Sequence, residues 1–112
     1  MTVKKTPSVE REILRPLWKV HILHHASKAP IVGHWMLEEL REHGYHVSPG
    51  TLYPMLARLC QLGWLAPVKP KRGEAHTNAV HYRLTKPGRA VLAEVQARLC
   101  ELQSEIFSKR GA

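Results

Sequence analysis

Apolar residues recur every three or four positions through most of the chain, a spacing that places them on one face of a helix. The first such stretch covers about residues 9–26 and carries two neighbouring apolar rows. These rows are Ile13, Leu17 and Val20, and beside them Leu14, Trp18 and Ile22. So wide a stripe predicts a helix that is buried on two sides. Because Pro16 cannot donate to the carbonyl of Glu12, we expect the helix to kink or begin there.

A second helix is predicted after the loop at residues 27–30. Val32, Trp35, Met36 and Leu40 share one of its faces, and acidic residues and Arg41 occupy the other. Gly44 follows at the place where a glycine commonly ends a helix. The predicted helix therefore ends just before residues 45–47, which lead into the next one.

The third predicted helix begins at Ser48, whose side chain we expect to accept from the first free backbone N–H groups. Pro49 follows in the first turn, where a missing N–H is tolerated. The predicted inward residues are Leu52, Met55, Leu56, Leu59 and Leu62, and Gly63 ends the helix. Pro54 lies in the helix interior, where proline is unfavourable by about 3 kcal/mol. Local exceptions of this kind are expected at functional sites.

Strand signals follow Gly63 and predict a hairpin. Residues 64–68 and 79–84 have the length of short strands, and in the second Val80, Tyr82 and Leu84 alternate with polar residues. A polar, basic connection, residues 69–78, joins them. Two helices joined by a tight turn and followed by such a hairpin predict a winged helix-turn-helix. The expected fold class is mainly α with a small β-hairpin, completed by a C-terminal helix.

That last helix is predicted from Thr85, as its cap, to about residue 109. It carries a narrow apolar row, Leu92, Val95, Leu99, Leu102 and Ile106, at spacings of three and four. This row resembles the seam of a coiled coil and predicts docking to a partner helix, for which we favour a second copy of the chain. We therefore divide the chain into a DNA-binding domain, residues 1–89, and a dimerisation helix, residues 90–112.

Charge then indicates a partner. The 112 residues carry a formal net charge of +8, and the sequence pI is about 9.9. From Arg58 to Arg89, both included, there are seven basic residues and one acidic residue, Glu74. Most of the excess positive charge therefore falls in this stretch. Such a local excess of positive charge favours a polyanion, above all nucleic acid.

The outward side of the third helix and the basic connection supply the candidate DNA contacts. These are Ser48, Thr51, Tyr53, Arg58 and Gln61 on and beside the helix, and Lys69, Lys71 and Arg72 between the strands. Arg58 has the donors to bind a guanine edge or a phosphate, and the N–H groups at the helix start favour a phosphate oxygen. The basic connection would reach the backbone or the minor groove without reading sequence.

The run from Ser48 to Leu65, SPGTLYPMLARLCQLGWL, resembles the signature of the PadR family of bacterial transcriptional regulators. Gly33 with Trp35-Met36, and Tyr82-Arg83-Leu84-Thr85 followed by Gly88, match the family as well. The resemblance covers roughly residues 13–102. It is to the compact members of the family in particular, which have a single short C-terminal helix. His34 departs from the pattern, since tyrosine often stands there.

The resemblance implies a homodimer built from the first and last helices, with two recognition helices in successive major grooves of a near-palindromic DNA operator. It also implies repression that is relieved by a small aromatic or hydrophobic effector. We take Trp18 and Trp35 as the candidate effector-binding residues.

Two sensing alternatives remain open at this stage. His21 and His25 lie one helical turn apart with His24 adjacent, but two ligands do not make a metal site, so we expect none. Cys60 and Cys100 both fall in helical patterns, and we interpret them as small buried hydrophobic residues. A metal- or thiol-responsive regulator on the same fold stays an alternative.

The remaining classes are less favoured. The sequence has no evident Ser/His/acid set, paired carboxylates or glycine-rich phosphate loop, so we expect neither an enzyme nor a cofactor. A winged-helix protein-interaction module without DNA binding, or an RNA-binding winged domain, stays possible on the fold alone. Because the sequence has no signal-peptide pattern and no long apolar run, we expect a cytoplasmic protein without a membrane partner.

Overall fold

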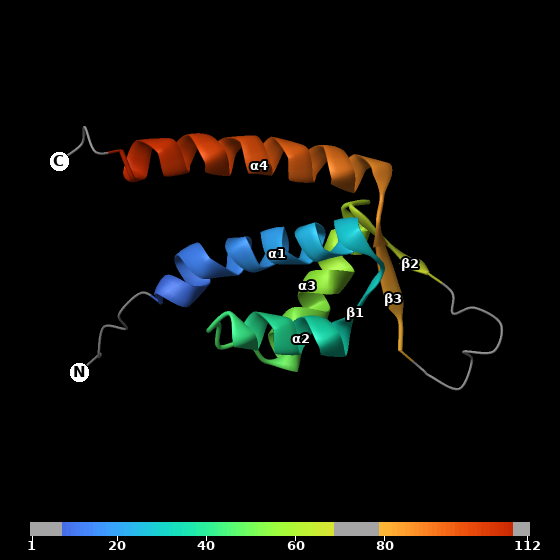
Figure 1. The fold of residues 1–112 in the computed structure, drawn as a ribbon. Coiled ribbons are helices and arrows are strands. Elements are labelled where there is room, and N and C mark those ends of the chain that lie inside the picture. Colours follow the sequence, from blue (N-terminus) through green and yellow to red (C-terminus); the bar gives the residue numbers. More distant parts are fainter. Residues whose placement is uncertain (1–7, 69–78, 109–112) are drawn as a thin grey trace, which may run out of the picture.

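The computed structural model describes residues 8–68 and 79–108. A π-helical segment, η1 (Glu10–Leu14), leads into α1 (Arg15–Lys28), β1 (Ile31–Val32), α2 (Gly33–Glu42) and α3 (Pro49–Gln61). The hairpin strands β2 (Leu65–Val68) and β3 (His81–Leu84) then precede α4 (Lys86–Ile106). In Figure 1, α1 runs between α4 on one side and the pair α2 and α3 on the other. The predicted helices and the winged-helix fold class are confirmed.

The sheet has one strand more than the sequence predicted. Its order is β1-β3-β2, and both pairings are antiparallel. The two residues of β1 pair with β3 through Ile31 opposite Tyr82 and Val32 opposite His81. A two-residue strand is too short to show alternation, so no local pattern announces it. By pairing with β3, this strand ties the start of α2 to the hairpin.

The centre of the molecule is α1. It contacts α4, α2 and β3, in agreement with its predicted burial on two sides. The fully buried residues of the core are Trp18, Ile22, Met36, Leu40, Leu52, Leu56, Leu59 and Leu65. Pro16 lies in the first turn of α1, directly after the π-helical segment, so the predicted helix start or kink is confirmed. Ile13, which the sequence placed on the buried face, is exposed.

Glycines end α2 and α3 in the same way. Gly44 and Gly63 have φ angles of 93° and 80°, in the left-handed region that favours glycine. The N–H of Tyr45 donates to the Leu40 carbonyl, and the N–H of Trp64 donates to the Leu59 carbonyl. Each bond reaches back five residues across its glycine, which is the Schellman arrangement. The predicted ends of both helices are therefore confirmed.

Two details of α3 differ from expectation. Within the described residues no side chain caps the helix: the Ser48 hydroxyl lies 3.3 Å from that of Thr51, and the Ser48 carbonyl accepts from the Thr51 and Leu52 N–H groups. The predicted side-chain cap was wrong, because the two hydroxyls pair with each other. Leu62, predicted to point inward, is exposed as the residue that closes the helix.

The first turn of α4 is fixed to the corner where α3 ends. The Thr85 hydroxyl accepts from the Gly88 N–H, as predicted for a cap, and donates to the Gly63 carbonyl. The Thr85 N–H donates to the Trp64 carbonyl over 3.1 Å. Gly88 is buried so closely that a Cβ atom there would lie 2.1 Å from the Trp64 carbonyl oxygen. This corner therefore joins α3 and α4 through backbone contacts.

No helix in residues 8–68 and 79–108 combines the length and the apolar character needed to cross a bilayer.

The tight corner makes Gly88 a test of the fold. Gly88→Ala should lower the free energy of unfolding by about 2–3 kcal/mol, because the new methyl group meets backbone that cannot rotate away. Gly50→Ala in α3 is the matched control, since the nearest atom to its Cβ is the Ser48 Oγ at 3.8 Å. That change should raise the free energy of unfolding by about 0.5–1 kcal/mol. Urea titration of the three proteins compares them, and equal midpoints would contradict the close packing at Gly88.

Candidate nucleic-acid interface

The third helix has two distinct faces. Leu52, Met55, Leu56 and Leu59 are buried and hold α3 in the core. On the other side, Ser48, Tyr53, Arg58 and Gln61 are exposed, and Thr51 is half-buried. Pro54 also lies on the exposed side, and the helix continues through it. The five candidate contacts of the helix therefore all lie outside its buried side, on what we call the α3 face.

The hairpin follows directly from α3. Strands β2 and β3 pair from Leu65 opposite Leu84 to Val68 opposite His81. Arg83, on β3, is exposed. The other predicted contacts, Lys69, Lys71 and Arg72, lie outside the described residues. Val68 and His81, which precede and follow that connection in the chain, lie opposite each other at one end of the sheet.

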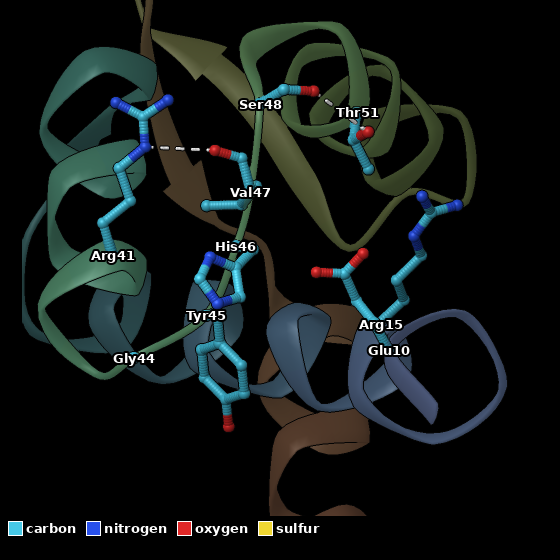
Figure 2. Close-up of a pocket in the computed structure, with 9 residues that line it drawn as sticks. All are labelled: Glu10, Arg15, Arg41, Gly44, Tyr45, His46, Val47, Ser48 and Thr51. Atoms are coloured by element: carbon cyan, nitrogen blue, oxygen red, sulfur yellow. Dashed lines mark hydrogen bonds between the residues drawn. The ribbon is translucent and has the colours of Figure 1, made fainter. Parts of the chain in front are cut away.

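A cavity of about 620 Å³ opens beside the start of α3 (Figure 2). It is lined by Glu10, Arg15, Arg41, Gly44, Tyr45, His46, Val47, Ser48 and Thr51. Figure 2 shows the Glu10 and Arg15 side chains extending from η1 and α1 toward the start of α3. Neither arginine of this cavity was predicted from the sequence, because Arg15 and Arg41 come from different helices and share no local motif with the α3 face.

Arg41 has a defined structural role in this cavity. Its Nε donates to the Val47 carbonyl over 3.1 Å, across the turn that joins α2 to α3. The bond satisfies a carbonyl of the turn and restrains the approach of the chain to Ser48. Arg41 therefore helps to orient the start of α3. The rest of its guanidinium group remains available to an anion.

Gly33 positions Tyr53. A Cβ atom on Gly33 would lie 2.6 Å from Cε1 of the Tyr53 ring, so only glycine lets the ring rest against the start of α2. The ring is nevertheless 45% exposed and borders a second cavity of about 240 Å³ with His34 and Tyr82. Gly33 matched the family pattern, and the structure supplies its physical reason: the glycine leaves room for an aromatic side chain of the α3 face.

The two tryptophans chosen as effector contacts occupy different environments. Trp18 is fully buried in the core, so it presents no surface to a ligand in this conformation. Trp35 is 46% exposed and lines an apolar cavity of about 460 Å³. The other residues of that cavity are His25, Lys28, Ala29, Pro30, Ile31 and Val32. Only Trp35 therefore borders a space for a small molecule.

The apolar row of α4 changes character along the helix. Leu92 is buried in the core of its own chain, so it offers no free surface, and Val95 is half-buried. Leu99, Leu102 and Ile106 are exposed, and the exposure rises from 37% at Leu99 to 59% at Ile106. The free part of the predicted seam is therefore its C-terminal half. Since α4 is one continuous helix, residue 89 marks no break in the fold.

The two cysteines also differ. Cys60 is half-buried against the core, and burial raises the pKa of its thiol. Cys100 is exposed on α4, so its predicted burial was wrong. The sequence pattern placed it on a helix correctly, but the side of α4 on which it lies is not covered by this chain.

The chain is similar to known proteins over most of its length. The sequence profile described as the transcriptional regulator PadR-like family matches residues 22–94, from α1 into α4. The chain is also 45% identical over 97 residues to "Transcriptional regulator Rv3488" of Mycobacterium tuberculosis. That similarity covers 87% of this chain and 89% of the relative.

Solved structures share the fold. A PadR-like transcription factor from Bacteroides fragilis has a TM-score of 0.72 and 26% identity, covering 88% of this chain and 94% of its own. A PadR-like transcriptional regulator from Bacillus cereus has a TM-score of 0.75 and 22% identity, covering 85% of this chain and 92% of its own. At 22% identity the second likeness concerns the fold alone.

The difference between the cysteines predicts their reactivity. The thiolate is the reactive form, and a raised pKa leaves less of it at a given pH. Under native conditions near neutral pH, we expect iodoacetamide to modify Cys60 several-fold more slowly than Cys100, as followed by peptide mass spectrometry. The same measurement in concentrated urea is the control, where the two rates should converge. If Cys60 reacts faster than Cys100 in the folded protein, its thiol is not protected by burial and a raised pKa. That result would favour a thiol sensor.

Proposed function

This chain belongs to the PadR-like family of transcriptional regulators, and we propose that it acts as a homodimeric repressor of a near-palindromic DNA operator. The observation that carries the proposal is the α3 face: a helix is held by four buried side chains and presents polar and cationic groups outward. Winged helix-turn-helix proteins insert such a helix into the major groove. The family is one of transcriptional regulators, whose role is not enzymatic.

The proposed contacts divide by chemistry. Arg58 and Gln61 would meet base edges, since an arginine matches the two acceptors of guanine and a glutamine matches adenine. Ser48, Thr51 and Tyr53, near the start of α3, would bind phosphates together with the Arg15 and Arg41 guanidinium groups of the adjoining cavity. Lys69, Lys71 and Arg72 would add backbone contacts without sequence preference.

The proposed dimer uses the exposed row Leu99, Leu102 and Ile106. Two further apolar residues, Val9 just before η1 and Ile13 within it, are also exposed. Exposed apolar side chains in such a row are unfavourable in a monomer, and helices with this spacing bury them by pairing. We therefore place the second copy against α4 and η1.

For an effector we propose the apolar cavity beside Trp35. Its walls are largely aliphatic and aromatic, a lining that suits a small hydrophobic or aromatic molecule. Two of its residues, Ile31 and Val32, form β1 and pair with β3 of the hairpin. A ligand at Trp35 would thus touch β1, the strand that precedes α2 and pairs with the hairpin.

Selection of bound DNA from a random pool tests the proposed function. The purified protein should enrich a two-fold symmetric consensus whose half-sites are about one helical turn apart. Enrichment of no sequence over random duplex would reject sequence-specific binding and leave an interaction module as the better explanation.

Arg58 is the sharpest single test of the α3 face. On the selected operator, Arg58→Ala should weaken binding by about 1–3 kcal/mol and relax preference at one base pair per half-site. Arg98→Ala is the control, because it removes the same charge from an exposed position on α4. Fluorescence anisotropy at matched salt measures both. If the two variants lose affinity equally and neither changes sequence preference, Arg58 contributes charge only and does not read a base.

Leu102 tests the proposed dimer. Leu102→Glu should weaken dimerisation at least about 100-fold, because the change occurs twice in a symmetric interface and each buried leucine contributes about 1.5–3 kcal/mol. Ala97→Glu is the control, since residue 97 lies on the side of α4 opposite the apolar row and is exposed. Analytical ultracentrifugation over a concentration series gives the dissociation constants. A Leu102→Glu protein that remains dimeric would place the interface elsewhere.

A further inference from the structure

Three histidines from two helices converge outside the α3 face. His21 and His25 lie one turn apart on α1, and His43 is the residue that closes α2. Each offers a ring nitrogen, and these three nitrogens lie within 4.8 Å of one another. In the sequence, only the α1 pair and its neighbour His24 stand close together. The third histidine could not be assigned from the sequence, because His43 reaches the pair through the packing of α2 on α1.

A carboxylate lies beside the cluster. Glu39 lies one turn before His43 on α2, and its Oε1 is 3.5 Å from Nε2 of His43. The same oxygen is 3.6 Å from Nε2 of His25 on the other helix. The side chain of Glu39 is largely buried, so its charge is directed at the imidazoles more than at solvent. The three imidazoles lie together, and the carboxylate oxygen beside two of them is available as a fourth donor.

We propose that His21, His25 and His43, with Glu39, form a binding site for a divalent transition-metal ion of the zinc type. Zn²⁺ and its neighbours in the first transition row favour imidazole nitrogen and accept carboxylate oxygen, and Zn²⁺ takes four ligands in tetrahedral array. Neither cysteine belongs to the cluster, so the site contains no thiolate. The site goes beyond DNA binding and does not depend on it.

The geometry needs little adjustment to bind an ion. Metal–nitrogen bonds of about 2.0–2.1 Å place tetrahedral ligand atoms about 3.3 Å apart, so the nitrogens must approach one another by at most about 1.5 Å. His43 is half exposed and free to make most of this movement by side-chain rotation. Its ring centroid is already 4.9 Å from that of His21.

The surroundings hold the α1 ligands in place. The Tyr45 hydroxyl lies 3.4 Å from Nε2 of His21, a contact that fixes how the ring is turned. The Trp35 ring meets His25 edge-on at a centroid distance of 5.2 Å. These contacts limit the orientations that the two imidazole rings adopt.

Burial also favours the form of the imidazoles that binds metal. It is the main cause that lowers the pKa of His21, and the neighbouring His43, His25 and His24 lower it further. Burial likewise lowers the pKa of His25, although Glu39 opposes the shift. A metal ion binds neutral imidazole. The lowered pKa values support a site that the geometry alone already defines.

A bound ion would join α1 to the end of α2. Residues 44–48, the turn into α3, follow His43 directly. The ion would therefore restrain the segment that carries the start of α3, and His25 also borders the apolar cavity beside Trp35. On the proposed function, such a site is placed to influence both DNA binding and an effector.

Metal titration of the full chain, purified without a histidine tag and treated with a chelator, tests the site. Co²⁺ is the probe, because its visible absorption is intense in a tetrahedral site and weak in an octahedral one, and Zn²⁺ is then added in competition. We expect one Co²⁺ per protomer with the tetrahedral spectrum, displaced by one equivalent of Zn²⁺. His25→Gln and His43→Gln should each weaken binding at least tenfold.

The chain contains a matched control. His34 and Glu38 also form a histidine–carboxylate pair one turn apart on α2, with 3.2 Å between Nε2 and Oε1. Both side chains are well exposed. Among residues 8–68 and 79–108, no other histidine groups with them as a possible metal ligand. His34→Gln should leave Co²⁺ affinity and spectrum unchanged. Circular dichroism without metal checks that each variant is folded, and His43→Gln, at a half-exposed position, is the variant least dependent on packing.

The readouts need no DNA, so failure of the metal site and failure of operator binding are separate results. Equal Co²⁺ affinity in the parent, His25→Gln and His43→Gln proteins would overturn the site. So would an octahedral spectrum, or loss of binding in His34→Gln alone.

Discussion

The arrangement of the whole molecule depends on the backbone contact between the first turn of α4 and the corner that ends α3. Thr85 bonds to both carbonyls of that corner, and Gly88 lies against the second of them with no room for a side chain. The helix proposed to face DNA and the helix that extends out of the core are therefore fixed to each other without a flexible linker. Core packing holds each of them, but this corner sets the angle between them.

Much of the fold was predictable because its signals are local. Gly44 and Gly63 end helices by their own backbone freedom, and Thr85 caps α4 through a residue three positions away. The features that escaped prediction depend on tertiary contacts. The two-residue strand β1 exists only because β3 lies beside it, and periodicity could not show that Leu62 stays exposed.

The same distinction applies to the sites. The outward residues of α3 followed from its helical period, because their inward neighbours fix the orientation of the helix. The cavity cations Arg15 and Arg41 were missed, as was the approach of His43 to His21, because each brings together helices far apart in sequence. The burial of individual side chains could not be predicted either. Periodicity assigned Leu92 and Leu99 to one row, but the core of this chain covers only Leu92.

The length of α4 acts as a lever. Its 21 residues extend about 30 Å from the pinned first turn, and the exposed apolar residues lie toward the far end. A tilt of only about 5° at Thr85 would displace that far end by about 2.6 Å over such a length. In a dimer joined there, small substitutions at the base of α4 would change the separation of the two α3 helices. The spacing of half-sites could thus diverge among relatives while the residues that touch DNA stay the same.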